Sequence, residues 1–136
     1  MKVWYGFGSE HSSNLVMIGR FEEIHDAKEA KRVIDQLIKQ VGAEPELYRW
    51  DAAPEGRRYS DAMLELFNKS GIYNVGPAEL EQFNYDVNVD LREREIVITT
   101  EEIDVSAFLK ILIGKGARVE VYSAHDYPDT KYGRGK

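Results

Sequence analysis

The residues with the most evident chemical potential lie near the start of the chain, in the segment Glu10-His11-Ser12-Ser13. A histidine titrates near pH 7, and a neighbouring carboxylate can fix its tautomer. His11 is therefore a candidate general base or ligand, with Glu10 as acid or orienting group and a serine as donor or nucleophile. However, the side chains of residues adjacent in sequence rarely converge on one site. Ser, Asn and Gly are also common turn residues. An exposed loop without chemistry explains the same segment.

Two further histidines, His25 and His125, come from separate segments of the chain. Histidines combined with Asp or Glu form zinc sites. No HxH, HxxxH or HExxH spacing, however, places two of these histidines on one face of an element. Asp26, beside His25, is expected to cap a helix instead. We therefore predict no metal site and no cofactor, and retain His125 with Glu10 and His11 as catalytic candidates.

A second candidate site lies in the long connection between residues 44 and 59, where arginines alternate with aromatic residues. Loops of this length without regular structure are often functional. Arginine beside aromatic side chains suits a bound anion or the centre of a protein interface. A solvated loop anchored by its aromatic residues is the alternative. The candidate binding residues are Tyr48, Arg49, Trp50, Arg57 and Arg58, together with Trp4 from the first predicted strand.

The aromatic residues Trp4, Tyr5 and Phe7 bear on nucleic-acid binding. Flanked by glycines, they superficially resemble the aromatic strand on which some RNA-binding sheets stack bases, but the residue order of that motif is not met. The chain has 24 acidic and 18 basic residues and a net charge of −6. An acidic chain repels phosphate backbones on average, so nucleic acid is not an expected partner.

The absence of cysteine excludes disulfides, thiolate catalysis and Cys-ligated metal sites, and it fits a reducing cytoplasm. The sequence has no GxxxxGK[ST] phosphate loop, no GxGxxG between strand and helix, and no GxSxG elbow. No stretch approaches the roughly 20 apolar residues of a membrane span, and the N-terminus does not match a signal peptide. We therefore expect a cytoplasmic protein without membrane contact.

Two apolar strands, residues 2–7 and 15–22, are expected to form a hairpin that presents the Glu10–His11 loop. Both strands are apolar on both faces, which is typical of central strands. The clearest helix begins at Asp26, its predicted N-cap, and stops at Gly42, with an apolar stripe at three- and four-residue steps.

The rest of the chain predicts short helices and a second group of strands. Ser60 is expected to cap one helix, Pro77 to begin another and Asp104 to cap a third. Predicted strands cover residues 87–91, 96–100 and 118–123. With the first strand set aside, the order is βαββαβ, the ferredoxin-like order. We predict a two-layer α+β sandwich of about five strands in a mixed or antiparallel sheet, ferredoxin-like with an extra N-terminal strand, and with helices on one face.

The length of 136 residues suits a single domain, predicted over residues 1–126, with a flexible tail at 127–136. The leading functional hypothesis is a non-enzymatic interaction module of the immunity-, antitoxin- or adaptor-like kind, with a protein partner or self-association through Trp4. One alternative is an enzyme that acts on a small molecule or phosphoester through Glu10 and His11. Another is a regulatory domain that senses a small anion near Arg57 and Arg58.

Overall fold

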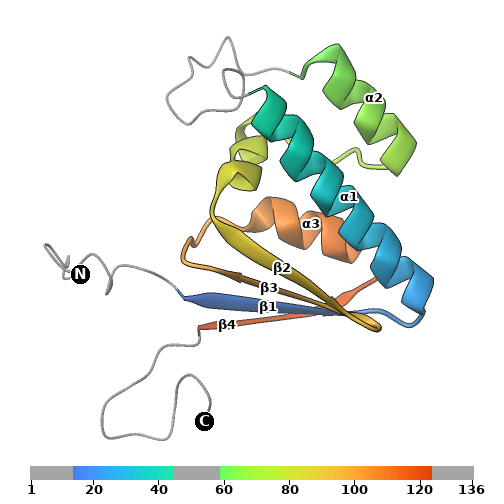
Figure 1. Cartoon of the computed structure of the whole chain (residues 1–136), viewed down its shortest axis with the longest axis vertical. Coiled ribbons are helices and arrows are strands. Elements are labelled where there is room, and N and C mark those ends of the chain that lie inside the picture. Colours follow the sequence, from blue (N-terminus) through green and yellow to red (C-terminus); the bar gives the residue numbers. More distant parts are fainter. Residues whose placement is uncertain (1–13, 45–58, 124–136) are drawn as a thin grey trace, which may run out of the picture.

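The computed structural model describes residues 14–44 and 59–123 of the chain. Figure 1 shows a four-stranded sheet with helices packed against it. The strands in these ranges are β1 (Leu15–Arg20), β2 (Val87–Arg92), β3 (Glu95–Thr100) and β4 (Arg118–Ser123). The helices are α1 (Ile24–Ala43), α2 (Asp61–Ser70), the 3-10 helix η3 (Pro77–Asn84) and α3 (Ser106–Gly114).

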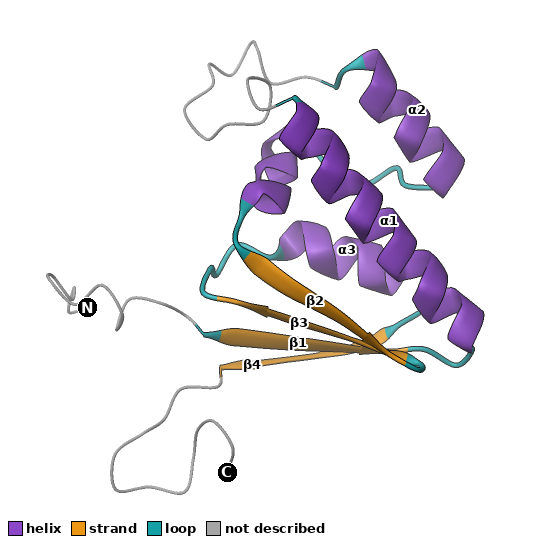
Figure 2. Ribbon diagram, in the orientation of Figure 1, coloured by secondary structure: helices purple, strands orange, loops and turns teal. Residues whose placement is uncertain are grey.

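The sheet is antiparallel throughout, and its strands lie side by side in the order β2-β3-β1-β4. Figure 2 shows the helices on one side of the sheet and the other side without a helix. The predicted α+β architecture is confirmed. The finer prediction, about five strands in a ferredoxin-like order with an extra N-terminal strand, is not confirmed, because the described residues form four strands.

β1 lies in the interior of the sheet, with β3 along one edge and β4 along the other. Each residue of β1 has a paired residue on both neighbouring strands. The expectation that this apolar segment is central is therefore confirmed. The expected hairpin with residues 2–7 has no free edge of β1 to use, and that prediction is wrong. Residues 2–7 themselves lie outside the described part of the chain.

The core lies between the sheet and the helices because side chains alternate along each strand. Met17, Ile96 and Ile98 are fully buried on the helical side. A Cβ atom added at Gly19 would lie 3.2 Å from Cδ2 of Leu112, so α3 packs directly over the backbone of β1. The helix α1 contributes a continuous buried stripe, which comprises Ala27, Ala30, Val33, Ile34, Leu37 and Val41.

Helix α1 begins earlier and ends later than the sequence predicted. Its N-cap is Glu23, whose side chain makes no capping hydrogen bond. The first turn is closed by the backbone instead, where Ala27 N donates to the Glu23 carbonyl at 3.3 Å. Asp26, the predicted cap, lies within this turn, where a negative charge interacts favourably with the helix dipole. The helix also continues past Gly42.

The predicted cap of α2 at Ser60 is confirmed. Ser60 Oγ accepts a hydrogen bond from Met63 N at 3.0 Å, which satisfies one free amide of the first turn. Gly71 ends the helix with a φ of 68°, in the left-handed region that favours glycine.

Helix α3 is capped from a different element. Its N-cap residue is Val105, and the predicted cap at Asp104 is therefore wrong. Gln82 of η3 accepts a hydrogen bond from Ala107 N at 2.7 Å, and its Nε2 donates to Ser106 Oγ at 3.1 Å. A side chain from another helix thus satisfies the buried amide that a local cap would otherwise bind.

The turn between β2 and β3 consists of Glu93 and Arg94. Glu93 has a φ of 54°, which is unfavourable for a residue with a Cβ atom. Within the described ranges, no helix combines the length and the apolar character that a membrane crossing needs. The predicted tail at residues 127–136 lies outside those ranges.

Candidate interaction surface

The side of the sheet opposite the helices is lined by alternate residues of all four strands. We call this surface the open face. Its members follow from the strand register and from Gly19, which faces α3 and thereby fixes the side of its neighbours. The open face comprises Val16, Ile18, Arg20, Asn88, Asp90, Arg92, Glu95, Val97, Thr99, Arg118, Glu120 and Tyr122.

The centre of the open face is apolar. Val16 and Ile18 lie on β1, and Val97 pairs with Ile18 from β3. All three are half-buried, although no described helix covers them. Tyr122 lies beside Val16 on the edge strand β4 and is 48% exposed.

Charged residues surround this centre and are linked by ion pairs. Arg20 Nε donates a hydrogen bond to Glu95 Oε2 at 2.8 Å, and Arg20 Nη1 contacts Glu120 Oε1. Arg92 Nε donates to Asp90 Oδ2 at 3.0 Å on the neighbouring edge. These groups are exposed, so each pair contributes little to stability. Their arrangement nevertheless fixes where positive and negative charge lies on the surface.

The two ends of the open face differ in charge. At the turn end, Arg20 and Arg92 line a hollow of about 520 Å³ together with Arg94 and two glutamates, Glu93 and Glu95. Arg118 pairs with Arg20 in the same row of the sheet. This end therefore carries an excess of arginine.

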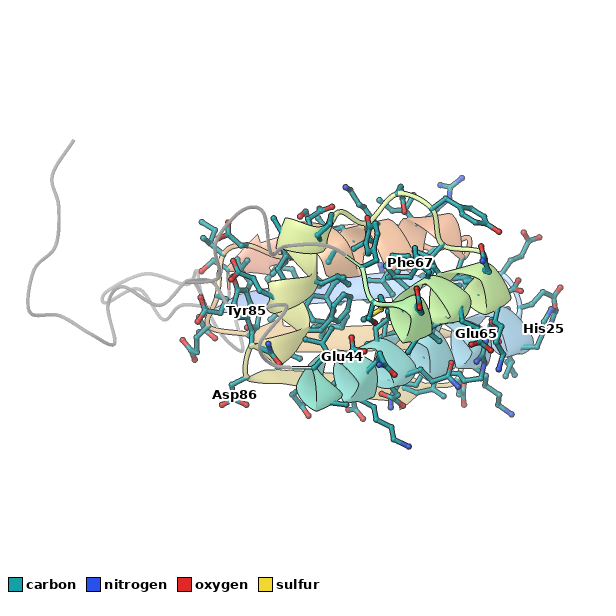
Figure 3. All side chains as sticks on the ribbon, turned by 90° about the horizontal axis from the view of Figure 1, so that it is seen from above. His25, Glu44, Glu65, Phe67, Tyr85 and Asp86 are labelled. Atoms are coloured by element: carbon teal, nitrogen blue, oxygen red, sulfur yellow. The ribbon has the colours of Figure 1, made fainter. Side chains whose placement is uncertain are left out.

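The opposite end is acidic. A hollow of about 250 Å³ there is lined by Asp86, Glu101 and Asn14, together with Asn88 and Thr99 of the open face. The Nδ2 atom of Asn14 is buried and has no hydrogen-bond partner among the residues that the structure describes. Figure 3 shows Asp86 and His25, the latter at the start of α1, at opposite ends of the molecule.

A separate polar cluster lies on the helical side, around Glu79 of η3. Its carboxylate accepts hydrogen bonds from Gly76 N at 2.9 Å, Lys110 Nζ at 2.7 Å and Ser106 Oγ at 2.6 Å. Burial raises the pKa of Glu79, but these hydrogen bonds outweigh it and lower the pKa below the ordinary value. A carboxylate held ionised by three donors is a poor general base. The cluster instead joins η3 to α3.

Comparison with known protein families finds a match that covers nearly the whole chain. Residues 1–134 match the family described as "Family of unknown function (DUF6375)". The chain belongs to DUF6375. Searches of curated proteins and of solved structures found no significant match for this DUF6375 chain.

The site residues predicted from the DUF6375 sequence all lie outside the described residues. These are the catalytic candidates Glu10, His11 and His125 and the binding candidates Trp4, Tyr48, Arg49, Trp50, Arg57 and Arg58. Each of these assignments stays a prediction. The remaining histidine, His25, is exposed and lies 3.2 Å from Asp26 through Nε2. Within the described ranges, no three His, Asp or Glu residues group closely enough to hold a metal ion.

The sequence did carry a signal for the open face of this DUF6375 chain. Val16 and Ile18 make the second face of β1 apolar, which indicates a strand covered on both sides. The structure places described helices on one side only. The second apolar face of β1 is therefore not covered by a described helix.

Proposed function

We propose that this protein is a non-enzymatic interaction module whose contact surface is the open face. The observation that carries the proposal is the apolar centre formed by Val16, Ile18 and Val97 on a sheet side that no described helix covers. Burying such a centre against another protein removes apolar area from water, which is the main driving force of association.

The composition of the open face supports a protein partner. Protein interfaces typically combine an apolar centre with a polar rim and are enriched in tyrosine and arginine. Tyr122 borders the apolar centre, and Arg20, Arg92 and Arg118 lie in the rim. Two of these arginines are paired with acidic groups, which disfavours a phosphate backbone as ligand. The class of module proposed is immunity-, antitoxin- or adaptor-like and cytoplasmic.

Affinity capture with matched tyrosine variants tests this proposal. The baits are the wild-type chain, Tyr122→Ser on the open face and Tyr73→Ser, whose 78% exposed side chain lies outside that face. We expect proteins from an extract of the producing cells to bind the wild-type and Tyr73→Ser baits and to be depleted from the Tyr122→Ser bait. A purified protein identified in this way must then bind directly with the same preference. Equal capture by both variants would contradict the proposal.

A second candidate function, binding of a small anion, is favoured by the arginine-lined hollow at the turn end. Arg20, Arg92 and Arg94 border its volume of about 520 Å³, which is large enough for a small carboxylate or phosphate. Glu93 and Glu95 line the same hollow and oppose an anion. A thermal-shift titration with inorganic phosphate and citrate tests this candidate, because a ligand at 100 times its dissociation constant adds about 2.7 kcal/mol. No shift, or an equal shift in Arg94→Ala, would remove it.

The finer fold class is a further part of the proposal. With α2 and η3 set aside, the described elements follow the order βαββαβ. We propose that these six elements form a ferredoxin-like core into which α2 and η3 are inserted between α1 and β2. An experimental structure checks this assignment by the path of each crossover connection.

A further inference from the structure

We propose that the open face binds a second copy of this chain, with the two sheets face to face and their strands antiparallel across the interface. The inference rests on the proposed function, because it names the partner of the same surface. The two-fold axis would lie between the sheets and perpendicular to the strands. A symmetric dimer of this kind brings the same patch of both copies together, so the patch must be complementary to itself.

The unequal charge of the two ends makes the open face self-complementary in this orientation. Antiparallel stacking puts the arginine-rich turn end of one copy over the acidic end of the other. Arg92, the last residue of the edge strand β2, then lies opposite the partner's Asp86, the residue just before β2. The reciprocal contact forms at the other end of the interface. Both residues are exposed. Because the dimer is symmetric, each such contact occurs twice.

The middle rows of the open face are compatible with the same axis. The sheet register gives one row through Asp90, Val97, Ile18 and Glu120 and the next through Asn88, Thr99, Val16 and Tyr122. The two-fold axis exchanges these rows. Ile18 then contacts Val16 of the partner, and Glu120 lies opposite the phenol of Tyr122. One contact is unfavourable, Glu95 against Glu101. Glu95 is paired within its own chain with Arg20 at 2.8 Å, as Arg92 is with Asp90 at 2.9 Å.

Parallel stacking of the same two faces is disfavoured by charge. With the axis along the strands, β2 of one copy lies over β4 of the other. Arg92 would then lie over Arg118, and Asp90 over Glu120. These two like-charge contacts outnumber the one opposite-charge contact of the middle strands, Glu95 over Arg20. Like charges placed directly opposite each other in an interface are strongly unfavourable. The charges of both edge strands therefore select the antiparallel arrangement.

The size of the open face predicts a weak dimer. Four strands of six residues cover roughly 20 Å by 20 Å, or about 400 Å² per copy, from ordinary strand spacing and rise. Stable complexes bury about 800 Å² per partner. We therefore expect a dissociation constant in the micromolar range or above, with fast exchange between monomer and dimer.

Sedimentation velocity on charge-reversal variants tests both the partner and its orientation. The variants are Arg92→Asp and Asp86→Arg, studied over roughly 10 µM to 1 mM to span a weak equilibrium. We expect each variant alone to dimerise about tenfold more weakly than wild type, because each change creates two like-charge contacts. An equimolar mixture of the two should associate like wild type, since the mixed dimer restores both opposite-charge contacts. Lys28→Asp, an exposed reversal on α1, serves as the control and should not alter dimerisation.

The outcomes separate this inference from the proposed function. A wild-type chain that stays monomeric, variants that dimerise like wild type, or a mixture without recovery would each overturn the antiparallel dimer. If capture by the open face still depends on Tyr122, the interaction module stands and its partner is a different protein. Thermal melting of every variant confirms folding, and the recovery in the mixture cannot arise from unfolded chains.

Discussion

Arg20 connects three strands of the sheet through its guanidinium group. It lies on β1 and contacts Glu95 of β3 and Glu120 of β4, so one cation holds two acidic side chains from strands on either side. Because all three groups are exposed, the contacts place charge on the open face rather than stabilise the fold. Since Arg92 is paired with Asp90 in the same way, the net positive charge at this end resides mainly in Arg94 and Arg118.

Glu93 is expected to destabilise the turn between β2 and β3. Its φ of 54° is readily adopted by glycine but not by a residue with a Cβ atom. We expect Glu93→Gly to raise the free energy of unfolding by about 1 kcal/mol or less, because relief of strain exceeds the added freedom of the unfolded chain. Urea denaturation measures the change. Glu102→Gly, at an exposed loop position without a positive φ, should be neutral or destabilising, and a gain there equal to that at position 93 would contradict the explanation.

At the scale of elements, η3 links the helical layer together. Phe83 packs against Phe108 of α3 with ring centroids 4.8 Å apart, and Gln82 and Glu79 of η3 bind the first turns of the same helix. A short 3-10 helix has little stability of its own. Its position therefore depends on these contacts with α3, and α3 in turn depends on η3 for its cap.

Removing the side chain of Gln82 should loosen α3. Gln82 is 6% exposed, and its loss leaves the amide of Ala107 buried without a partner. We expect Gln82→Ala to lower the free energy of unfolding by about 1–3 kcal/mol. Hydrogen exchange should show the loss of protection at the start of α3. The matched variant Gln36→Ala, at an exposed site on α1, should change stability by less than about 0.5 kcal/mol.

The lowered pKa of Glu79 predicts how the free energy of unfolding depends on pH. Because its pKa is lowered in the folded protein, its stabilisation is complete above the ordinary carboxyl pKa of 4.5 and is lost as pH falls below that value. Glu79→Gln should therefore be less stable than wild type at neutral pH, with a difference that shrinks in acid. Urea denaturation at several pH values measures this. Glu65→Gln, an exposed change on α2, should leave the profile close to wild type; a constant deficit for Glu79→Gln would argue against the assignment.

At the scale of the whole molecule, local sequence patterns predicted most helices and strands. Contacts between residues far apart in the sequence were not predicted. The start of helix α2 was predicted because Ser60 binds an amide only three residues away, so the contact is local in the sequence. The cap of α3 was missed because Gln82 lies 25 residues from the amide that it binds. Periodicity identified β1 as central, yet it does not reveal which strands flank it.

The residues of the open face were not among those predicted from the sequence, for a physical reason. Sequence patterns single out chemically reactive residues such as His11, whereas the centre of the open face is built from Val16, Ile18 and Val97. Each of these aliphatic side chains is common in strands. They form one apolar surface only because strand pairing places them side by side. An apolar surface of this kind depends on the strand register, which no single segment of the sequence encodes.

The ladder between β1 and β4 has a consequence for chain connectivity. Leu15 and Ser123 are paired residues, so the described core starts and finishes at adjacent points of the sheet. A circular permutant that joins the natural ends with a flexible linker and opens between Glu93 and Arg94 should thus keep every contact of the core. Circular dichroism and a single cooperative unfolding transition would verify it, whereas an unfolded permutant would show that this turn is indispensable to assembly of the sheet.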